Sequence, residues 1–330
     1  NADQPFMRIT SKVKDYSLEF IDEILEKKET LFSQIKFNRL FYFIDEAIVE
    51  LYKDKIMAFI GDDKFLAIPA VEQNKSYLKL ADYYRLLIES GFRRGDVLVT
   101  FGGGILQDIS GFIASTLYRG VKWLFVPTTL LAQADSCIGS KTSINFEDGK
   151  NLIGSFYPPD LIVIDTYFCG SLPQPCFNSG LGEIIKYHLM VDEGKYKLLK
   201  DYLLAGDLRE QKKLKSIIVS SLEIKKSYFE SDEFDTGRRN LLNYGHCFGH
   251  ALESATKFAV PHGEAVIAGM GFANLLSLQR GILEKDVYED IETVLRPYYP
   301  AINLETISDG TIMHFLQKDK KRTGSNLTMI

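Results

Sequence analysis

The first half of the chain alternates short, apolar, β-prone runs with amphipathic stretches of helical period. The apolar runs predict five strands, at Phe41–Ile44, Phe65–Ile68, Val97–Phe101, Trp123–Val126 and Leu161–Ile164. Between some of them lie stretches such as Tyr77–Ser90, whose apolar residues recur with the period of a helix. Strands and helices in alternation are typical of a parallel sheet with helices on both faces. Such sheets bind their ligands at the carboxyl ends of the strands.

Beyond about Pro173 the pattern changes, and long amphipathic stretches replace the β-prone runs. They predict helices at Asn178–Val191, Leu208–Phe229, Leu241–Lys257 and Gly263–Gln279. We therefore expect two domains: an α/β, Rossmann-like domain with a parallel sheet over residues 1–172, and an all-α domain over residues 173–330.

The composition is that of an ordinary globular protein. Of the 330 residues, 45% are hydrophobic and 25% charged, and the net charge of -5 argues against a general nucleic-acid or membrane-surface binder. No apolar run approaches the roughly 20 residues that span a bilayer. Asp3 lies where a signal peptide would carry positive charge. The four cysteines form no CxxC pair, so we expect a reduced, cytoplasmic protein.

A glycine-rich turn follows the third predicted strand. Gly102, Gly103 and Gly104 lead into the helical stretch Ile105–Thr116. Glycines let the backbone approach a pyrophosphate, and the start of a helix supplies free N–H groups. The turn lacks the GxGxxG pattern, so an ordinary strand-to-helix turn is an equally good interpretation of it alone.

Further polar side chains follow other predicted strands. Asp45 comes just after the first strand and could accept hydrogen bonds from a ribose, and Thr128 and Thr129 end another. Each of them alone is more typical of a cap or a turn. Together with the glycines they indicate one nucleotide-binding crevice.

Three of the five histidines lie close together in the sequence. His246 and His250 are four residues apart, so a helix presents them on one face, and His262 begins the next helical stretch. Glu183 lies on a separate predicted helix. Two imidazoles and one carboxylate suit a catalytic zinc site with positions open to substrate. Taken singly, each is more often a satisfied core or surface residue, which is how we interpret the other two histidines.

Basic residues accompany these groups. Lys141 and Lys150 flank a loop, Lys186 lies one helical turn after the proposed carboxylate ligand, and Arg239 precedes the first histidine by about two turns. On an acidic protein, basic residues around a proposed metal indicate an anionic substrate with phosphate and carboxylate groups. The alternative, a solvated surface cation, applies to most of the 39 lysines and arginines.

Long motifs run in unbroken order through both halves, over roughly residues 40–328. They are Glu72-Gln-Asn-Lys75, Gly102-Gly-Gly-Ile-Leu-Gln-Asp108, Tyr118-Arg119-Gly120, Pro127-Thr-Thr-Leu-Leu-Ala-Gln-Ala-Asp135, Gly139-Ser-Lys141, Gly149-Lys150-Asn151, Gly182-Glu183-Ile-Ile-Lys186, Arg239-Asn-Leu-Leu-Asn243-Tyr-Gly-His246, His262-Gly-Glu and Asp319-Lys320-Lys321. In these motifs the sequence resembles the dehydroquinate synthase family of the sugar-phosphate cyclases.

The resemblance implies a role for each matching residue. Glu183, His246 and His262 would ligate a divalent metal, zinc or cobalt. The NAD contacts would be Asp45, Glu72, Lys75, Gly102, Gly103, Gly104, Asp108, Thr128, Thr129, Lys141, Lys150, Phe168, Ser171 and Leu172. The substrate and catalytic shell would be Arg119, Asp135, Lys141, Asn151, Lys186, Lys225, Arg239, Asn243, His250 and Lys320.

The resemblance also implies a reaction. The chain would convert 3-deoxy-arabino-heptulosonate 7-phosphate to 3-dehydroquinate and phosphate, a lyase step of the shikimate pathway of aromatic amino acid biosynthesis. NAD+ would take a hydride and return it within one turnover, so no NADH would accumulate. The family further implies a homodimer.

Three other interpretations stay open. A cyclase using another sugar phosphate, of the 2-epi-5-epi-valiolone or 2-deoxy-scyllo-inosose type, would share the fold, although Asn243 speaks against the second type. The dehydroquinate reaction is favoured by four retained residues, Lys186, Lys225, His250 and Lys320. A metal-dependent polyol dehydrogenase would release NADH. A catalytically silent NAD-binding protein would have no need of the intact metal ligands.

Overall fold

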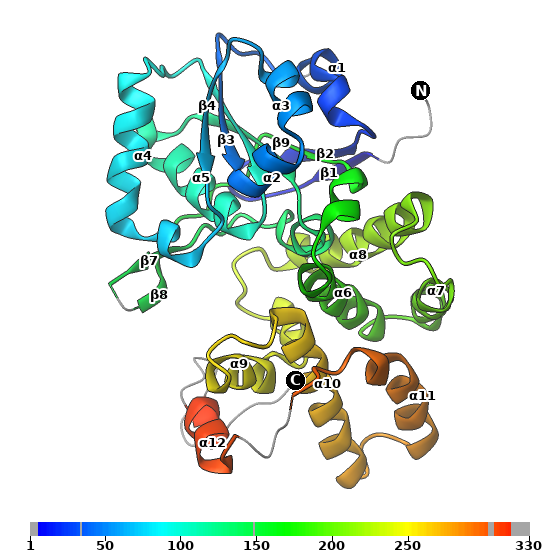
Figure 1. Cartoon of the computed structure of the whole chain (residues 1–330). Coiled ribbons are helices and arrows are strands. Elements are labelled where there is room, and N and C mark those ends of the chain that lie inside the picture. Colours follow the sequence, from blue (N-terminus) through cyan, green and yellow to red (C-terminus); the bar gives the residue numbers. More distant parts are fainter. Residues whose placement is uncertain (1–5, 34, 148, 303–306, 318–330) are drawn as a thin grey trace. The chain divides into compact units, whose positions relative to one another are not determined.

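The computed structural model describes residues 6–33, 35–147, 149–302 and 307–317 of the chain (Figure 1). Its contacts divide the chain into two compact units, Asn1–Ser171 and Leu172–Ile330. The division falls one residue before the boundary that we placed from the change in sequence pattern. Each unit is described by itself.

The described part of the first unit contains a seven-stranded sheet in the order β1-β2-β9-β6-β5-β3-β4. All neighbouring strands pair in parallel except β1 with β2. The strands are β1 (Phe6–Ile9), β2 (Tyr16–Phe20), β3 (Leu40–Asp45), β4 (Lys64–Ile68), β5 (Val97–Gly102), β6 (Lys122–Pro127) and β9 (Leu161–Ile164). The five strands expected from the sequence are β3, β4, β5, β6 and β9, which confirms the parallel α/β sheet. The strands β1 and β2 were not predicted.

Helices cover both faces of this sheet. They are α1 (Lys28–Phe32), α2 (Glu46–Leu51), α3 (Lys53–Ile60), α4 (Tyr77–Glu89) and α5 (Gly104–Thr116). Alternate residues of β3 point to opposite faces. Tyr42 therefore joins the core cluster that includes Phe59 of α3, whereas the Phe43 ring contacts the ring of Tyr83 in α4.

The chain reverses direction across the sheet between β3 and β5. It passes from β3 outward to β4, returns to the other side of β3 as β5, and continues to β6. In parallel sheets a reversal of this kind leaves a crevice at the carboxyl ends of the two central strands. Two of the predicted nucleotide-site elements flank this point, because Asp45 ends β3 and Gly102 ends β5. A separate two-stranded hairpin, β7 (Ile144–Phe146) and β8 (Gly149–Ile153), follows β6 in the chain.

The described part of the second unit is helical. Its helices are α6 (Gln174–Leu189), α7 (Glu193–Leu204), α8 (Gln211–Ser231), α9 (His246–Ala255), α10 (His262–Gln279), α11 (Lys285–Leu295) and α12 (Asp309–Gln317). The helix α6 packs against α8 and α10, and α10 packs against α9. Across the described ranges, no helix is both long and apolar enough to cross a membrane.

One predicted helix is shorter than its sequence pattern indicated. The amphipathic stretch 241–257 is broken at Gly245, which has a φ of 75°, and α9 begins only at His246. The segment Arg238–Asn243 forms a separate 3-10 turn. A side chain at position 245 would also collide with α10, because its Cβ would lie 2.7 Å from the carbonyl oxygen of Val266. Glycine is required here for both reasons.

Candidate functional site

Small residues bring three helices of the second unit into close contact. A Cβ on Gly182 of α6 would lie 2.4 Å from the carbonyl oxygen of Gly263 in α10, and one on Gly263 would lie 2.2 Å from that of Ser179. On α9, a Cβ at Gly249 would lie 3.0 Å from the carbonyl oxygen of Ala265. These positions hold glycine because the backbones approach too closely for a side chain. Adjacent residues on the same helices are thereby brought together.

The carboxylate of Glu183 meets two imidazole rings at this crossing. Its Oε1 lies 3.3 Å from Nε2 of His246 and 3.1 Å from Nε2 of His262. One potential ligand atom from each of the three residues lies within 4.8 Å of the others. The Glu183 side chain is fully buried, while 29% of the His262 side chain remains exposed. The cluster is therefore reachable from solvent on one side.

The outer nitrogen of each ring is already held in place. Nδ1 of His246 lies 3.2 Å from the carbonyl oxygen of Tyr244, and Nδ1 of His262 lies 3.3 Å from both carboxylate oxygens of Glu253. A histidine that ligates a metal usually donates its other N–H to a carbonyl or a carboxylate. One buried carboxylate and two imidazoles oriented in this way fit a divalent cation such as zinc or cobalt.

The charges in the cluster are strongly coupled. Burial alone would raise the pKa of Glu183, but the charge of Lys186 and the bonds to both histidines lower it well below its ordinary value. Burial, together with the charge of Lys186, lowers the pKa of His246. Burial would also lower the pKa of His262, but its hydrogen bonds to Glu183 and Glu253 outweigh it and raise that pKa to about 10. The surroundings thus keep the central carboxylate ionised, the form that binds a cation.

Two predicted substrate residues are lysines buried in this unit. Lys186 lies one turn after Glu183 in α6, contacts the Oε2 atom of that carboxylate and lies 4.6 Å above the centre of the Tyr187 ring. Lys225 is buried in α8, which packs against α6. Buried ammonium groups are rare in proteins unless they are paired. Lys186 meets this condition through its contact with Glu183.

The other predicted substrate residues of this unit vary in placement. His250 is exposed, with its ring 5.2 Å from that of His246 and 6.0 Å from that of His262. Arg239 belongs to the 3-10 turn, not to α9, and its guanidinium lies 5.4 Å from the centre of the Phe229 ring. The side chain of Asn243 donates to the carbonyl oxygen of Asn240. Lys320 lies outside the described residues.

In the first unit, two of the three glycines are required by the protein's own packing. A Cβ on Gly102 would lie 2.8 Å from Cβ of Leu106, and one on Gly103 would lie 2.9 Å from Cγ2 of Thr129. A Cβ on Gly104, the first residue of α5, would meet no atom within 4 Å. Gly104 is exposed, so the space in front of it is free for a ligand at the start of the helix.

Lys75 links several predicted nucleotide contacts. Its ammonium lies 3.1 Å from Asp108 of α5 and 3.6 Å from Glu72, and it donates over 2.8 Å to Asn151 of β8. Burial raises the pKa of Asp108 to about 6, although Lys75 and a backbone N–H oppose the rise. Glu72 also accepts from Asn145 of β7. The network therefore ties the β7–β8 hairpin to α5.

The remaining predicted nucleotide contacts of this unit have structural partners as well. Asp45 caps α2 by accepting from the N–H of Ala47, and Thr129 accepts from the N–H of Ala132 at the start of a π-helical turn. Phe168 is fully buried against Phe101, so its ring belongs to the core and is not available as a contact surface. Thr128 is buried, and the hydroxyl of Ser171 accepts a hydrogen bond from that of Tyr52. Lys141 and Lys150 are exposed. Leu172 is the first residue of the second unit.

Arg119 is not brought to the nucleotide crevice of its own unit. It follows the C-terminal end of α5 and precedes β6, which places it at the amino edge of the sheet. The glycines and Thr128 lie at the opposite, carboxyl edge, and Asp135 lies in the π-helical turn that follows Thr129 on that side. The resemblance had placed Arg119 and Asp135 together in the substrate shell, and the glycines and Thr128 among the NAD contacts.

Two acidic residues were not predicted. Glu253 follows His246 by seven residues and His250 by three, a spacing that places it on the same face of α9. Asp232 accepts from the N–H groups of Thr236, Gly237 and Arg239, and these bonds lower its pKa. Asp232 thus orders the loop that carries Arg239. The spacing of Glu253 was a signal present in the sequence.

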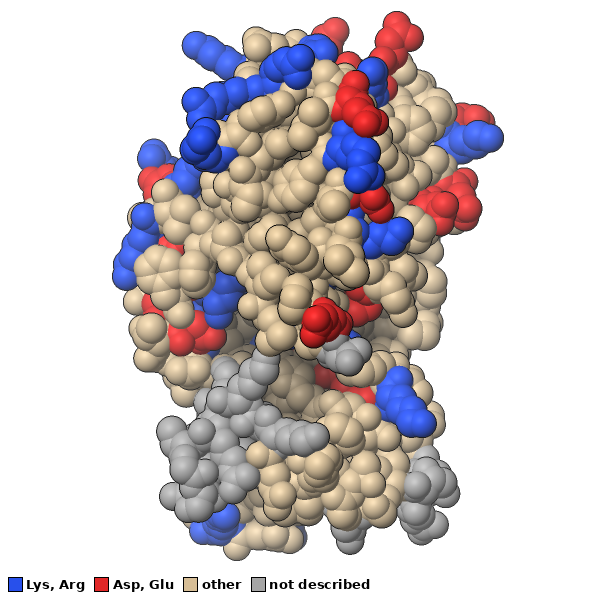
Figure 2. All heavy atoms as spheres, turned by 90° about the vertical axis from the view of Figure 1, so that its left-hand side faces the viewer, with Lys and Arg blue, Asp and Glu red and all other residues tan. Residues whose placement is uncertain are grey.

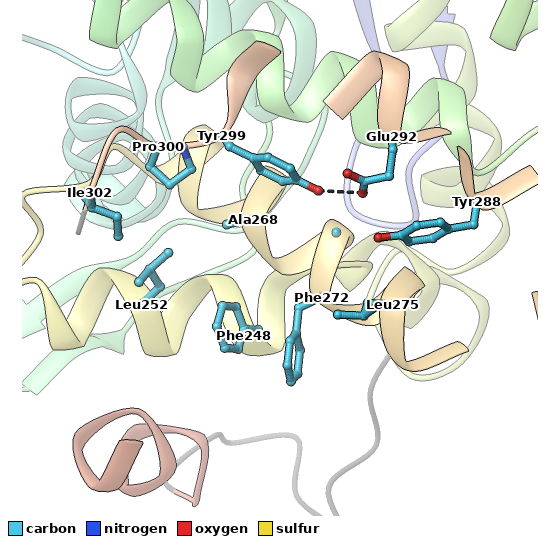
Figure 3. Close-up of a pocket in the computed structure, with 11 residues that line it drawn as sticks. Phe248, Leu252, Ala268, Phe272, Leu275, Tyr288, Glu292, Tyr299, Pro300 and Ile302 are labelled. Carbon is cyan, nitrogen blue, oxygen red and sulfur yellow. Dashed lines mark hydrogen bonds between the residues drawn. The ribbon is translucent and has the colours of Figure 1, made fainter. Parts of the chain in front are cut away.

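A hollow of about 400 Å³ lies beside α9 and α10 in the second unit (Figure 3). Phe248 and Leu252 of α9 line it, and the Phe248 ring stacks on that of Phe272 in α10 at 4.4 Å. Its main polar feature is the hydroxyl of Tyr299, which donates to Glu292 over 2.7 Å. Because its lining is largely apolar and includes none of the proposed metal ligands, we do not assign the chemistry to it.

Comparison with known proteins finds matches over most of the chain. The model of the 3-dehydroquinate synthase N-terminal domain matches residues 65–179, and that of the C-terminal domain matches residues 180–322. A 3-dehydroquinate synthase of Streptococcus pyogenes is 33% identical over 329 residues, which cover 98% of this chain and 91% of the relative.

Solved structures show the same fold. A 2-deoxy-scyllo-inosose synthase complexed with carbaglucose-6-phosphate, NAD+ and Co2+ superposes with a TM-score of 0.85 at 24% identity, covering 96% of this chain and 89% of that one. The 2-epi-5-epi-valiolone synthase of Streptomyces hygroscopicus subsp. jinggangensis 5008, with NAD+ and Zn2+ bound, gives 0.80 at 25% identity, covering 94% and 88%. Because both domain models and a near full-length relative agree, this chain belongs to the 3-dehydroquinate synthase family.

Proposed function

We propose that this protein converts 3-deoxy-arabino-heptulosonate 7-phosphate to 3-dehydroquinate and phosphate, as a lyase of the shikimate pathway. The observation that carries the proposal is the convergence of Glu183, His246 and His262 beside the buried Lys186. The group combines ligands for one cation with a buried positive charge for an anion. Family membership supplies the substrate.

The proposed cofactors are NAD and one divalent cation, zinc or cobalt. Glu183, His246 and His262 would hold the cation, and the carboxyl edge between β3 and β5 would hold the nucleotide. NAD+ supplies a reversible hydride acceptor, and the cation supplies Lewis acidity. The related 2-epi-5-epi-valiolone synthase, which was solved with NAD+ and Zn2+, supports this pair.

The protein's own residues bind and orient the substrate and manage its charge. Lys186 and Lys225 are buried, so their positive charges act in a medium of low dielectric and attract phosphate or carboxylate strongly. His250 is exposed beside the cluster and would accept or release a proton at its imidazole. We assign Arg239, Asn243 and Lys320 to the same substrate shell on family resemblance alone.

We further propose a cytoplasmic homodimer. In the first unit a hollow of about 480 Å³ lies along α4 and the end of α5, and it is lined by Tyr77, Tyr84 and Ile88, of which Ile88 is 50% exposed. Figure 2 looks onto the side of the molecule where α4 lies and shows basic and acidic side chains interspersed, with no continuous basic stripe. Exposed apolar surface of this kind is typical of an interface. The cytoplasmic location rests on the cysteine usage of the sequence.

The test of the activity is incubation of the full chain with NAD+, zinc and 3-deoxy-arabino-heptulosonate 7-phosphate. We expect release of one phosphate per carbocycle, no net NADH and loss of activity on treatment with a chelator. Phosphate release from sedoheptulose 7-phosphate in place of the expected substrate would reassign the protein to another cyclase. Stoichiometric NADH from a polyol would make it a dehydrogenase, and activity that resists the chelator would overturn the metal assignment.

A further inference from the structure

Glu253 lies next to the metal cluster without belonging to the proposed ligands. It sits on α9 at the seventh position after His246, so both project from the same face of the helix. Its two carboxylate oxygens each lie 3.3 Å from Nδ1 of His262, the first residue of α10. The Glu253 side chain is only 12% exposed. This contact is therefore largely withdrawn from solvent and from screening by salt.

The two histidines are held by different means. Nδ1 of His246 faces the main-chain carbonyl of Tyr244, which belongs to the same stretch of chain. His262 has no such local support, because it follows Pro261 at the very start of its helix and its Nδ1 faces a side chain from α9. Of the two Nδ1 contacts, only that of His262 can therefore be removed by substituting the side chain that it faces.

We propose that Glu253 is a positioning residue, which accepts the Nδ1 proton of His262 and so directs the Nε2 lone pair of that ring toward the cation site at Glu183. A proton held on Nδ1 fixes the tautomer in which Nε2 is free to bind. Nε2 of His262 lies 3.1 Å from Oε1 of Glu183, which shows the ring already turned in that direction. The inference rests on the metal-dependent function proposed above.

A second arrangement of the same residues is the main competitor. His250, Glu253 and His262 also offer three ligand atoms within 4.8 Å of one another, so they could hold a separate cation. In that arrangement Glu253, which contacts Nδ1 of His262 in the structure, would itself be a ligand of the cation. The two arrangements predict different metal contents, one cation per chain or two.

The experiment measures cobalt binding by the full chain without substrate. Co2+ affinity is determined by competition with a chromogenic chelator, together with the visible absorption of bound Co2+, for the wild type, Glu253→Ala and Glu253→Gln. We expect Glu253→Ala to weaken binding by about 10–100-fold and to change the absorption bands. Glu253→Gln keeps an acceptor oxygen but not the charge, so its Co2+ affinity should lie between those of the wild type and Glu253→Ala.

The matched control is Glu264→Gln. Glu264 lies two residues after His262 in α10 and accepts from Asn178 instead of a histidine, so its variant should bind cobalt as the wild type does. Thermal unfolding of each variant verifies that it is folded. Wild-type affinity and absorption in Glu253→Ala would overturn the inference, and so would two cobalt ions per wild-type chain.

The readout separates this inference from the proposed function. A wild type that is active on the heptulosonate, together with normal cobalt binding in Glu253→Ala, would leave the function standing and remove the role of Glu253. A wild type that is inactive on that substrate, together with weakened cobalt binding in Glu253→Ala, would remove the proposed function and leave the role of Glu253 standing. Failure of the wild type to bind cobalt at all would overturn both.

Discussion

Lys186 contacts the Oε2 atom of Glu183 from one turn further along α6, and both side chains are buried. The pair leaves the other oxygen of Glu183 facing the two histidines. A lysine in this position holds a positive charge next to the proposed cation. Binding of a metal does not require such a charge. The arrangement is understandable if Lys186 serves an anionic substrate.

Replacing this lysine should separate catalysis from cofactor binding. We expect Lys186→Met, which keeps the length of the side chain, to lower kcat/KM for phosphate release by about 100-fold or more, because a preorganised charge is lost. Cobalt content and NAD+ affinity should remain close to those of the wild type. The control is Lys195→Met, because Lys195 forms a surface ion pair with Glu223, which contributes little. Unchanged turnover in Lys186→Met would contradict the role.

The glycine turn offers a test of nucleotide approach. Gly104→Ala introduces a Cβ that meets no protein atom within 4 Å, so it should keep or slightly raise the melting temperature. It should nevertheless weaken NAD+ binding, measured calorimetrically, because the methyl group occupies the space where the backbone meets a pyrophosphate. Gly103→Ala, in contrast, should lower both the melting temperature and the NAD+ affinity, since its Cβ would lie 2.9 Å from Cγ2 of Thr129. Full NAD+ affinity in Gly104→Ala would show that the nucleotide does not approach there.

Asp45 has a structural role and a proposed binding role that two substitutions can separate. Asp45→Asn retains the cap on α2, since asparagine caps as well as aspartate, whereas Asp45→Ala loses the bond from Ala47 and about 1 kcal/mol of unfolding free energy. If the carboxylate accepts from a ribose, both variants should bind NAD+ roughly tenfold more weakly. Normal NAD+ binding by Asp45→Asn would show that Asp45 caps α2 and does not bind the nucleotide.

The buried His188 should make stability depend on pH. Its Nδ1 faces the carbonyl oxygen of Ile184 at 2.7 Å and its Nε2 faces the hydroxyl of Ser220 at 2.9 Å, an environment for a neutral ring. Burial lowers the pKa of His188 from 6.5 to about 4. The unfolded chain therefore takes up a proton between these values before the folded one does. The stability associated with the neutral ring is complete above pH 6.5 and is lost as the pH falls toward 4.

The expected size of this loss is on the order of 3 kcal/mol across that window. Urea unfolding at a series of pH values measures it. His188→Gln should be less stable at neutral pH but should show a flatter dependence between pH 6.5 and 4. His314→Gln is the control, because His314 is exposed in α12. Equal slopes in the wild type and His188→Gln would contradict the prediction.

Much of the fold followed from local pattern. The strands β3, β4, β5, β6 and β9 lie within one residue of their predicted ends, because a buried parallel strand is a short, nearly continuous apolar run. The start of α10 at His262 was likewise foreseen to within one residue. The start of α9 was not, because the break at Gly245 depends on the approach of Val266 from another helix.

The candidate site followed from the sequence only as a set of residue types. The spacing of His246 and His250 predicts a shared helix face. In the structure His246 lies in the cluster with Glu183 and His262, whereas His250 is exposed. Arg119, grouped with the substrate shell by resemblance, lies at the opposite edge of its sheet from the glycines. A motif shows that residues act together without showing where each one lies.

The sequence by itself determined the periodicity of the strands and helices, the glycine turn and the ligand types, because these depend on neighbours a few residues apart. Tertiary structure alone decided that Glu183 meets His262, which is 79 residues away, and that Glu253 supports that ring. The physical reason is the crossing of α6, α9 and α10 at Gly182, Gly249 and Gly263, where the absence of side chains sets how closely the backbones approach.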